Sequence, residues 1–176
     1  MEEKGLVIIY TGEGKGKTTA ALGLVLRAVG YKKKCLIVQF GKAWFTGELV
    51  GIKKLGPGVK IIQGGKGFLD ILGSKVPLSI HKKAAQETYT LLSKEIMSGK
   101  WDIIVADEIV GAVASKILPL TQLLQLIDQK PQQLDLVLTG HQAPMQLIKK
   151  ADLVTEMREV RHPFKKGLIA KKGIDF

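Results

Sequence analysis

The chain has 176 residues, 45% of them hydrophobic, with a formal net charge of +11 and a single cysteine. This length predicts one domain over residues 1–176 with a full core, and the apolar content excludes a disordered chain. No apolar run reaches the length of about 20 residues that a membrane helix needs, and the acidic start at Glu2 and Glu3 shows no signal peptide. One cysteine, Cys35, excludes an internal disulfide, so we expect a cytoplasmic protein with no membrane partner.

The positive charge is spread along the chain rather than gathered in a tail or in one helix. Such a charge is compatible with binding to a polyanion such as nucleic acid. A site for an anionic small ligand, surrounded by ordinary solvated lysines, explains it equally well. The charge alone does not choose between these two classes of partner.

The first predicted strand, residues 6–10, runs into a glycine-rich stretch at residues 11–19 and then into a helical pattern. A strand, a glycine turn, a lysine with hydroxyl residues and a helix make up a phosphate-binding P-loop. The glycines let backbone N–H groups close around an anion, and the start of the helix adds further free N–H groups. Lys17 is placed to reach phosphate oxygens and the Thr18 hydroxyl to bind Mg²⁺. We therefore predict a nucleoside triphosphate site.

This loop departs from the usual P-loop at one position. The standard spacing puts a glycine five residues before Gly16, where this chain has Thr11, followed by Gly12. The dinucleotide-binding pattern G-x-G-x-x-G fails, because its third glycine would fall on Lys17.

Strands and helices alternate along the rest of the chain. Continuous apolar runs predict buried strands at residues 35–40, 59–62, 101–106, 134–138 and 153–157. Helices are predicted up to Gly30 and at residues 79–98, 120–129 and 143–150, with His81 on an exposed face. Two long glycine-rich loops carry Trp44, Phe45 and Phe68, which either cover a ligand or anchor the loops to the core. The basic, glycine-interrupted residues from 162 onward suggest a small hairpin.

This order predicts an α/β fold, namely a three-layer, doubly wound, mostly parallel sheet of the P-loop NTPase (RecA-like) type. In such sheets, ligands bind beyond the carboxyl ends of the strands. The P-loop, both glycine-rich loops and the segments at 107–108, 139–141 and 158–162 all follow strands. We expect them to share one edge of the sheet.

The second half of the site is predicted at Asp107 and Glu108, which follow apolar residues as in a Walker B segment. A carboxylate here, opposite the Thr18 hydroxyl, would complete an Mg²⁺ site of hard oxygen ligands. The sequence does not decide which carboxylate binds the metal. In many ATPases a glutamate at this place orients the attacking water, so ATP hydrolysis stays open.

Three later side chains, His141, Arg158 and Arg161, are candidates for contacts with phosphate or with a carboxylate-bearing substrate. The chain has no Ser/His/Asp set and no Cys/His nucleophile pattern. We therefore predict no protein nucleophile.

Four blocks carry a family resemblance: GEGKGKTTAA at residues 12–21, VADE at 105–108, TG at 139–140, and the segment 151–176, which ends in GIDF. With smaller matches at 46–48 and 67–68, they resemble the P-loop type of cob(I)alamin (corrinoid) adenosyltransferase. The last block is the most specific, since general ATPases do not share it. The resemblance spans nearly the whole chain and is weakest between residues 49 and 100.

The resemblance implies transfer of the 5′-deoxyadenosyl group of ATP to the Co(I) centre of a reduced corrinoid, with release of the whole triphosphate. Co(I) is itself the nucleophile, so the protein neutralises the leaving group and holds C5′ in line. The resemblance implies catalytic roles for Lys17, Thr18 and Glu108, with Mg²⁺ at Thr18, Glu108 and Asp107. It also implies a homodimer and an electron-donating reductase as a partner. Contacts with ATP or the corrinoid are expected from Gly12, Glu13, Gly14, Lys15, Gly16, Lys17, Thr18, Thr19, Trp44, Phe68, His141 and Arg158.

The chain departs from this family pattern at three places. Relatives often carry tryptophan where this chain has Asp70, and arginine where it has His141. An aromatic residue after the Walker B segment is replaced by Val110 and Gly111. These departures concern contacts with the corrinoid more than the ATP site.

Other functions stay open from the residues themselves. A RecA-like, Mg²⁺-dependent ATPase acting on nucleic acid would account for Asp107, Glu108 and the positive charge. A nucleoside kinase or a non-catalytic nucleotide or corrinoid carrier is a further alternative.

Overall fold

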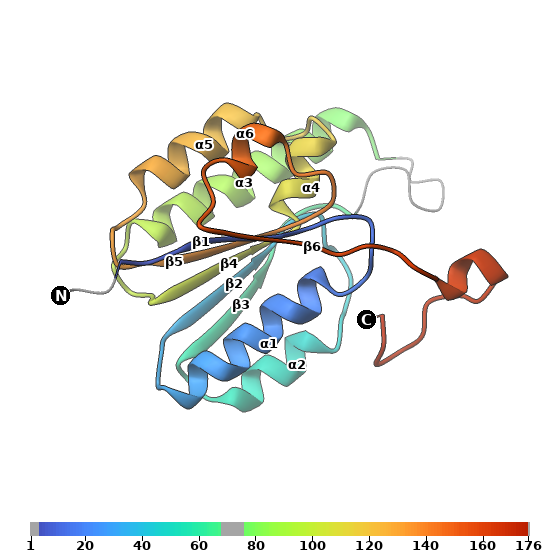
Figure 1. Ribbon diagram of the computed structural model, residues 1–176, viewed down its shortest axis with the longest axis horizontal. Helices are drawn as coiled ribbons and strands as arrows, with labels where there is room; N and C mark the ends of the chain where they lie inside the picture. Colours follow the sequence, from blue (N-terminus) through green and yellow to red (C-terminus); the bar gives the residue numbers. More distant parts are fainter. Residues whose placement is uncertain (1–3, 68–75, 176) are drawn as a thin grey trace.

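The computed structural model describes residues 4–67 and 76–175, and in this part of the chain six strands form one parallel sheet (Figure 1). The strand order is β3-β2-β4-β5-β1-β6, and each neighbouring pair is parallel. Helices α1 and α2 cover one face, and helices α3 to α6 cover the other. The predicted three-layer α/β fold is confirmed. No helix among the described residues is long and apolar enough to cross a membrane.

The strands are β1 (Val7–Thr11), β2 (Cys35–Gln39), β3 (Val59–Gln63), β4 (Ile103–Asp107), β5 (Asp135–Thr139) and β6 (Leu153–Glu156). The helices are α1 (Lys17–Gly30), α2 (Glu48–Gly51), α3 (Leu78–Ile96), α4 (Ile109–Ala114), α5 (Leu120–Gln129) and α6 (Met145–Ile148). Two 3₁₀ turns, η1 (Ile52–Leu55) and η2 (Pro163–Lys166), complete the elements.

The central strands read as continuous apolar runs because both faces of the sheet are covered. In β2, Leu36 and Val38 enter the core under α3 and α5, whereas Cys35 and Ile37 enter the core under α1. Successive side chains of a strand point to opposite faces, so one strand supplies both cores. This packing fixes the carboxyl ends of the strands at one edge, where the P-loop follows β1.

Helix α3 begins one residue and ends two residues earlier than the predicted 79–98, and its buried face differs from the prediction. Its buried stripe contains His81, which is only 3% exposed, while Ile80 is exposed. The predicted exposure of His81 is therefore wrong. The buried stripe follows the helical period and consists of His81, Ala84, Ala85, Thr88, Leu92 and Ile96.

Two loops also differ from expectation. The first contains α2 and η1, and the buried Ile52 anchors it, whereas Trp44 and Phe45 are exposed. These two aromatic residues therefore do not anchor the loop in the core. The predicted hairpin after residue 162 is wrong, since the described residues there form η2 and turns. The predictions for Phe68 and Asp70 lie outside the described residues.

Candidate nucleotide site

Polar side chains end the buried strands at the edge where the P-loop lies. Gln39, Asp107 and Thr139 close β2, β4 and β5, and all three are fully buried. Buried polar groups need partners, and these residues supply them for one another. Gln39 donates to Asp107 Oδ2 at 3.0 Å, and Thr139 donates to Asp107 Oδ1 at 2.7 Å. The strand ends thus form one connected hydrogen-bond network.

The Asp107 carboxylate is the centre of this network. Its Oδ1 also accepts a 2.7 Å hydrogen bond from the Thr18 hydroxyl, and Lys42 Nζ lies 3.5 Å from its Oδ2. Three hydrogen-bond donors and one ammonium group therefore surround a carboxylate whose side chain is 1% exposed. The Thr18 proton is used in this bond, so the lone pairs of its oxygen stay available to a cation.

The P-loop takes its shape from glycines and from the strand beside it. Gly12 and Gly16 have φ values of +97° and +118°, which side chains other than glycine rarely adopt. Gly14 N–H donates to the carbonyl of Met157 at 2.6 Å, just after β6. Lys17 lies inside the loop and donates to the carbonyls of Gly12 and Gly14 at 2.7 and 2.8 Å.

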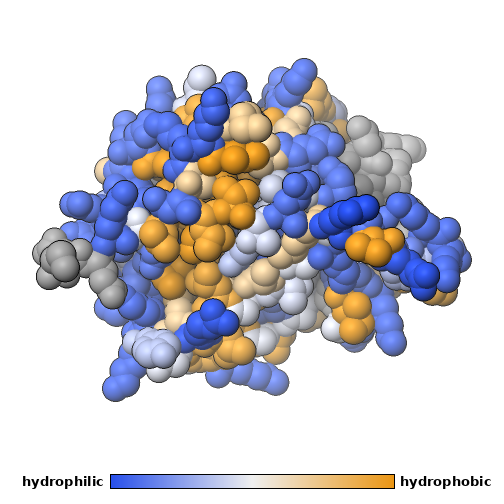
Figure 2. Space-filling view, viewed as in Figure 1, coloured by the Kyte–Doolittle hydropathy of each residue, from blue (hydrophilic) through white to orange (hydrophobic). Residues whose placement is uncertain are grey.

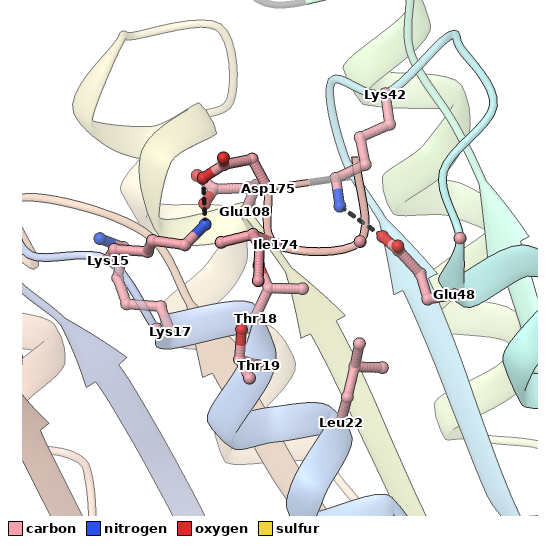
Figure 3. Close-up of a pocket in the computed structure, with 13 residues that line it drawn as sticks. Lys15, Lys17, Thr18, Thr19, Leu22, Lys42, Glu48, Glu108, Ile174 and Asp175 are labelled. Carbon is pink, nitrogen blue, oxygen red and sulfur yellow. Dashed lines mark hydrogen bonds and ion pairs between the residues drawn. The ribbon is translucent and has the colours of Figure 1, made fainter. Parts of the chain in front are cut away.

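A cavity of about 470 Å³ opens beside this loop. In Figure 3, Lys15 and Lys17 lie on one side of it and Lys42 and Glu48 on the other, with Ile174 between them. Its volume is in the range of small-molecule and cofactor sites. The cavity is lined by Lys15, Gly16, Lys17, Thr18, Thr19, Leu22, Lys42, Gly47, Glu48, Glu108, Gly173, Ile174 and Asp175.

Lys42 and Glu48 form an ion pair on the wall opposite the P-loop. Lys42 Nζ lies 2.9 Å from Glu48 Oε1, which also accepts a 3.1 Å hydrogen bond from Gln39. Burial alone would raise the pKa of Glu48, but the hydrogen bonds from Gln39 and Lys42 outweigh it and lower the pKa to about 2. Glu48 is therefore ionised at neutral pH, and the pair extends the strand-end network into the cavity.

Glu108 has an unusual backbone conformation. It follows β4 with φ +62° and ψ +13°, a left-handed conformation that is uncommon for residues other than glycine. Its N–H donates to the Thr139 hydroxyl at 2.9 Å, and its side chain lines the cavity. Burial, and then the charge of Asp107, raises the pKa of Glu108. The burial that raises this pKa disfavours the ionised carboxylate, and a nearby positive charge favours it.

His141 lies beside this glutamate. A Cβ on Gly111 would be 2.7 Å from Glu108 Oε2 and 3.2 Å from His141 Cε1, so both side chains flank the same glycine. Any larger residue at Gly111 would displace one of them. The absence of a side chain there leaves room for the imidazole and the carboxylate together.

The donors at this edge suit a hard cation that keeps part of its water shell. Mg²⁺ is usually bound by one or two protein oxygens together with substrate phosphates. The Thr18 hydroxyl and the Glu108 carboxylate both line the cavity and fit this pattern. Among residues 4–67 and 76–175 no three His, Cys, Asp or Glu side chains gather into an all-protein metal cluster.

The structure brings most of the predicted P-loop residues together at the cavity, from Lys15 to Thr19. Gly12 and Gly14 are buried within the loop and do not line the cavity. Glu13 and Arg158 are exposed and do not line it either. Trp44 lies elsewhere, against Gly67, where the two glycine-rich loops meet.

Lys42 and the segment 173–175 line the cavity without having been predicted as site residues. Lys42 follows β2 at the same edge, so its place after a strand was an available signal. The position of residues 173–175 against the P-loop could not be predicted, because no helical or strand periodicity in the sequence indicates it.

Comparison with known proteins identifies the family of this chain. A family model described as ATP:corrinoid adenosyltransferase BtuR/CobO/CobP matches residues 3–176. The chain is 33% identical to the corrinoid adenosyltransferase of Escherichia coli (strain K12) over 99% of this chain and 87% of the relative. It is 35% identical to a corrinoid adenosyltransferase of a Sinorhizobium species, with 99% and 82% covered, and 32% identical to corrinoid adenosyltransferase CobA of Salmonella typhimurium, with 99% and 87% covered. The chain belongs to the ATP:corrinoid adenosyltransferase family.

Proposed function

We propose that this chain, as one catalytic domain over residues 1–176, transfers the 5′-deoxyadenosyl group of ATP to the Co(I) centre of a reduced corrinoid. The observation that carries this proposal is a P-loop cavity lined by three lysines in a member of this family. Among the described residues that line the cavity there is no serine, cysteine or histidine. A reaction in which the substrate supplies the nucleophile needs none.

In the proposed reaction the electron pair of Co(I) forms the bond to C5′. The bond between C5′ and the α-phosphate oxygen breaks, and its electron pair leaves with the triphosphate. Lys15, Lys17 and Lys42 stabilise the charge that develops on this leaving group. Fixed cationic donors in a partly enclosed site act most strongly where charge develops in the transition state.

Mg²⁺ is proposed to be held by the Thr18 hydroxyl and Glu108, with Asp107 orienting Thr18 through its 2.7 Å hydrogen bond. When bound, the ion would neutralise phosphate charge. The protein residues do the positioning, since Asp107 is held by contacts with Thr18, Gln39, Thr139 and Lys42. Asp107 therefore acts through Thr18. Of the two neighbouring carboxylates, Glu108 is the one proposed to bind the metal directly.

The corrinoid is proposed to bind at the loops that carry Trp44 and Gly67, which follow β2 and β3 and in which Trp44 and Phe45 are exposed. Excluding water there would protect Co(I) during transfer. His141, which lies beside Glu108, and the exposed Arg158 are proposed to contact the substrates from outside the cavity. An electron-donating reductase supplies Co(I), and the cytoplasm is the proposed location.

A homodimer is proposed as the working assembly. Apolar side chains gather on the face that β6 crosses (Figure 2). Leu153 and Val154 on this edge strand are exposed, as is Leu6, just before the β1 strand that pairs with it. Sedimentation analysis tests the assembly, and Leu153→Glu is expected to shift it toward the monomer.

The product assay tests the function. The protein, ATP, Mg²⁺ and chemically reduced cobalamin should give adenosylcobalamin and free triphosphate in equal amounts. Lys17→Met should abolish most of the activity, whereas Lys94→Met, a matched change at an exposed lysine of α3, should leave it unchanged. ADP and phosphate as the only products would contradict the proposal. The comparisons give no support to an ATPase that acts on nucleic acid.

A further inference from the structure

The segment 171–175 returns to the P-loop from the far end of the chain. Asp175 Oδ1 lies 2.5 Å from Lys15 Nζ, and Gly173, Ile174 and Asp175 line the same cavity as the P-loop (Figure 3). An anionic side chain therefore occupies the mouth of a cavity whose other side is built to bind phosphate.

A local turn holds the Asp175 carboxylate in this position. Its Oδ2 accepts a 2.7 Å hydrogen bond from Lys171 N–H, and Asp175 N–H donates to the Lys171 carbonyl at 2.8 Å. The turn is exposed and belongs to no strand or helix. Asp175 is thus preorganised toward Lys15 by a turn that lies outside the sheet and its covering helices.

The three lysines of the cavity differ in what a phosphate must displace. Lys17 donates to neutral backbone carbonyls, and Lys42 is paired with carboxylates of the strand-end network. Lys15 is paired with a carboxylate of an exposed segment, and its side chain is 42% exposed. The Lys15 pair is the one that an incoming polyphosphate can open without disturbing the core.

We propose that Asp175 competes with the polyphosphate chain for Lys15, and so sets the affinity of the P-loop for ATP and for the released triphosphate. This inference rests on the proposed function. On binding, the Lys15 ammonium exchanges the carboxylate for a phosphate oxygen, and on release the exchange is reversed. No covalent bond changes in this step.

The competition matters most for product release. Triphosphate keeps every phosphate of ATP and gains a further negative charge on the oxygen released from C5′, so the P-loop side of the cavity should hold the product at least as tightly as the substrate. Release of product limits the turnover of many enzymes. An internal anion that replaces the triphosphate at Lys15 lowers its affinity without weakening contacts to the adenosyl group.

The test compares Asp175→Asn with Glu159→Gln, which removes the same charge from an ion pair with Lys165 outside the cavity. Dissociation constants for tripolyphosphate and MgATP are measured by calorimetry on the full chain. Asp175→Asn should tighten both about two- to fivefold, the range expected when an exposed ion pair must open before binding. Glu159→Gln should leave them unchanged. The difference should shrink at high salt.

A second pair of variants identifies the route of the effect. In the Lys15→Gln background, Asp175→Asn should no longer tighten tripolyphosphate binding, because the group for which both anions compete is gone. In the presence of Lys15, triphosphate should inhibit the Asp175→Asn enzyme at lower concentration than the wild type. Weaker or unchanged binding by Asp175→Asn, with normal formation of adenosylcobalamin, would overturn this inference alone. Failure of the wild type to bind tripolyphosphate would overturn it together with the proposed function.

Discussion

The Thr18 hydroxyl donates a 2.7 Å hydrogen bond to Asp107 Oδ1, which links the first turn of α1 to the end of β4. The two residues are 89 positions apart, and the bond holds the Thr18 side chain toward the strand end. Substituting Asp107 by asparagine should lower Mg²⁺ affinity of the ATP complex about 10- to 100-fold, as is usual for partners that orient a metal ligand.

Titration of Mg²⁺ against the ATP-loaded enzyme measures this effect. Thr18→Val should abolish the metal dependence of ATP binding, and Thr18→Ser, which keeps the hydroxyl, should retain it. Equal Mg²⁺ affinity in Thr18→Val and Thr18→Ser would contradict the assignment of Thr18 to the metal.

Thr139 stabilises the same network from the other side. Its hydroxyl donates to Asp107 and accepts from the Glu108 N–H. Thr139→Val should lower the free energy of unfolding by about 1–3 kcal/mol, because it leaves buried polar groups without partners. Urea denaturation measures the change.

A matched control for this change is Thr90→Val on the exposed side of α3, where the hydroxyl bonds only to the Gln86 carbonyl. A change within about 0.5 kcal/mol is expected there. If both variants lose the same free energy, the strand-end network does not carry the stability assigned to it.

Glu108 should give the protein a distinct dependence on pH. Burial and the charge of Asp107 raise its pKa above the ordinary value of 4.5. Between pH 4.5 and this raised pKa, the folded state therefore binds more protons than the unfolded state. This contribution to stability is present at low pH and is lost as the pH rises through the raised pKa. Glu108→Gln removes the group that titrates, so the variant should gain stability relative to the wild type as the pH rises toward neutrality.

Glu48 should change stability with pH in the opposite direction to Glu108, which provides an internal check. Its pKa is lowered to about 2, so its contribution is present above the ordinary carboxyl value and is lost as the pH falls toward 2. Denaturation curves between pH 3 and 8 for both glutamine variants should therefore diverge from the wild type in opposite directions. A Glu108→Gln protein that is less stable than the wild type at neutral pH would refute the predicted sign.

Two glycines test the close contact between the P-loop and β6. A Cβ at Gly14 would lie 2.7 Å from the carbonyl oxygen of Met157, whereas a Cβ at Gly23 in α1 meets nothing within 4 Å. Gly14→Ala should therefore displace the loop and weaken ATP binding. Gly23→Ala should raise the free energy of unfolding by about 0.5–1 kcal/mol, because alanine favours an exposed helix.

Nucleotide titration and thermal denaturation of the two variants measure these effects. Unchanged ATP affinity in Gly14→Ala would show that the loop does not need the contact with Met157.

The sequence was sufficient for the layers and for the phosphate side of the site. Continuous apolar runs such as β2 and β4 identify strands covered on both faces, and Asp107 stands out as a charge directly after such a run. The strand order was not predictable, since apolar runs of this kind carry no signal for which strand lies beside which. His81 was misplaced because an imidazole among lysines looks exposed, whereas in the structure it lies on the buried face of α3 together with Ala84, Thr88 and Leu92.

The contacts of Lys42 and Asp175 depend on how loops pack against the sheet edge, and loop sequences lack the helical or strand periodicity that would predict this packing. Lys42 is held in place by its ion pairs with Glu48 and Asp107. Asp175 is held by a turn that brings it to Lys15, 160 positions earlier in the chain. Neither relation is visible until the sheet order is known.

The placement of β6 beside β1 has a consequence for synthesis of the chain. The P-loop is made within the first 20 residues, but the Met157 carbonyl that its Gly14 contacts is made more than 130 residues later. A nascent chain that stops before β6 has an exposed edge at β1 and a P-loop supported on one side only. The ability to bind nucleotide should therefore appear late in translation, after the rest of the sheet has formed.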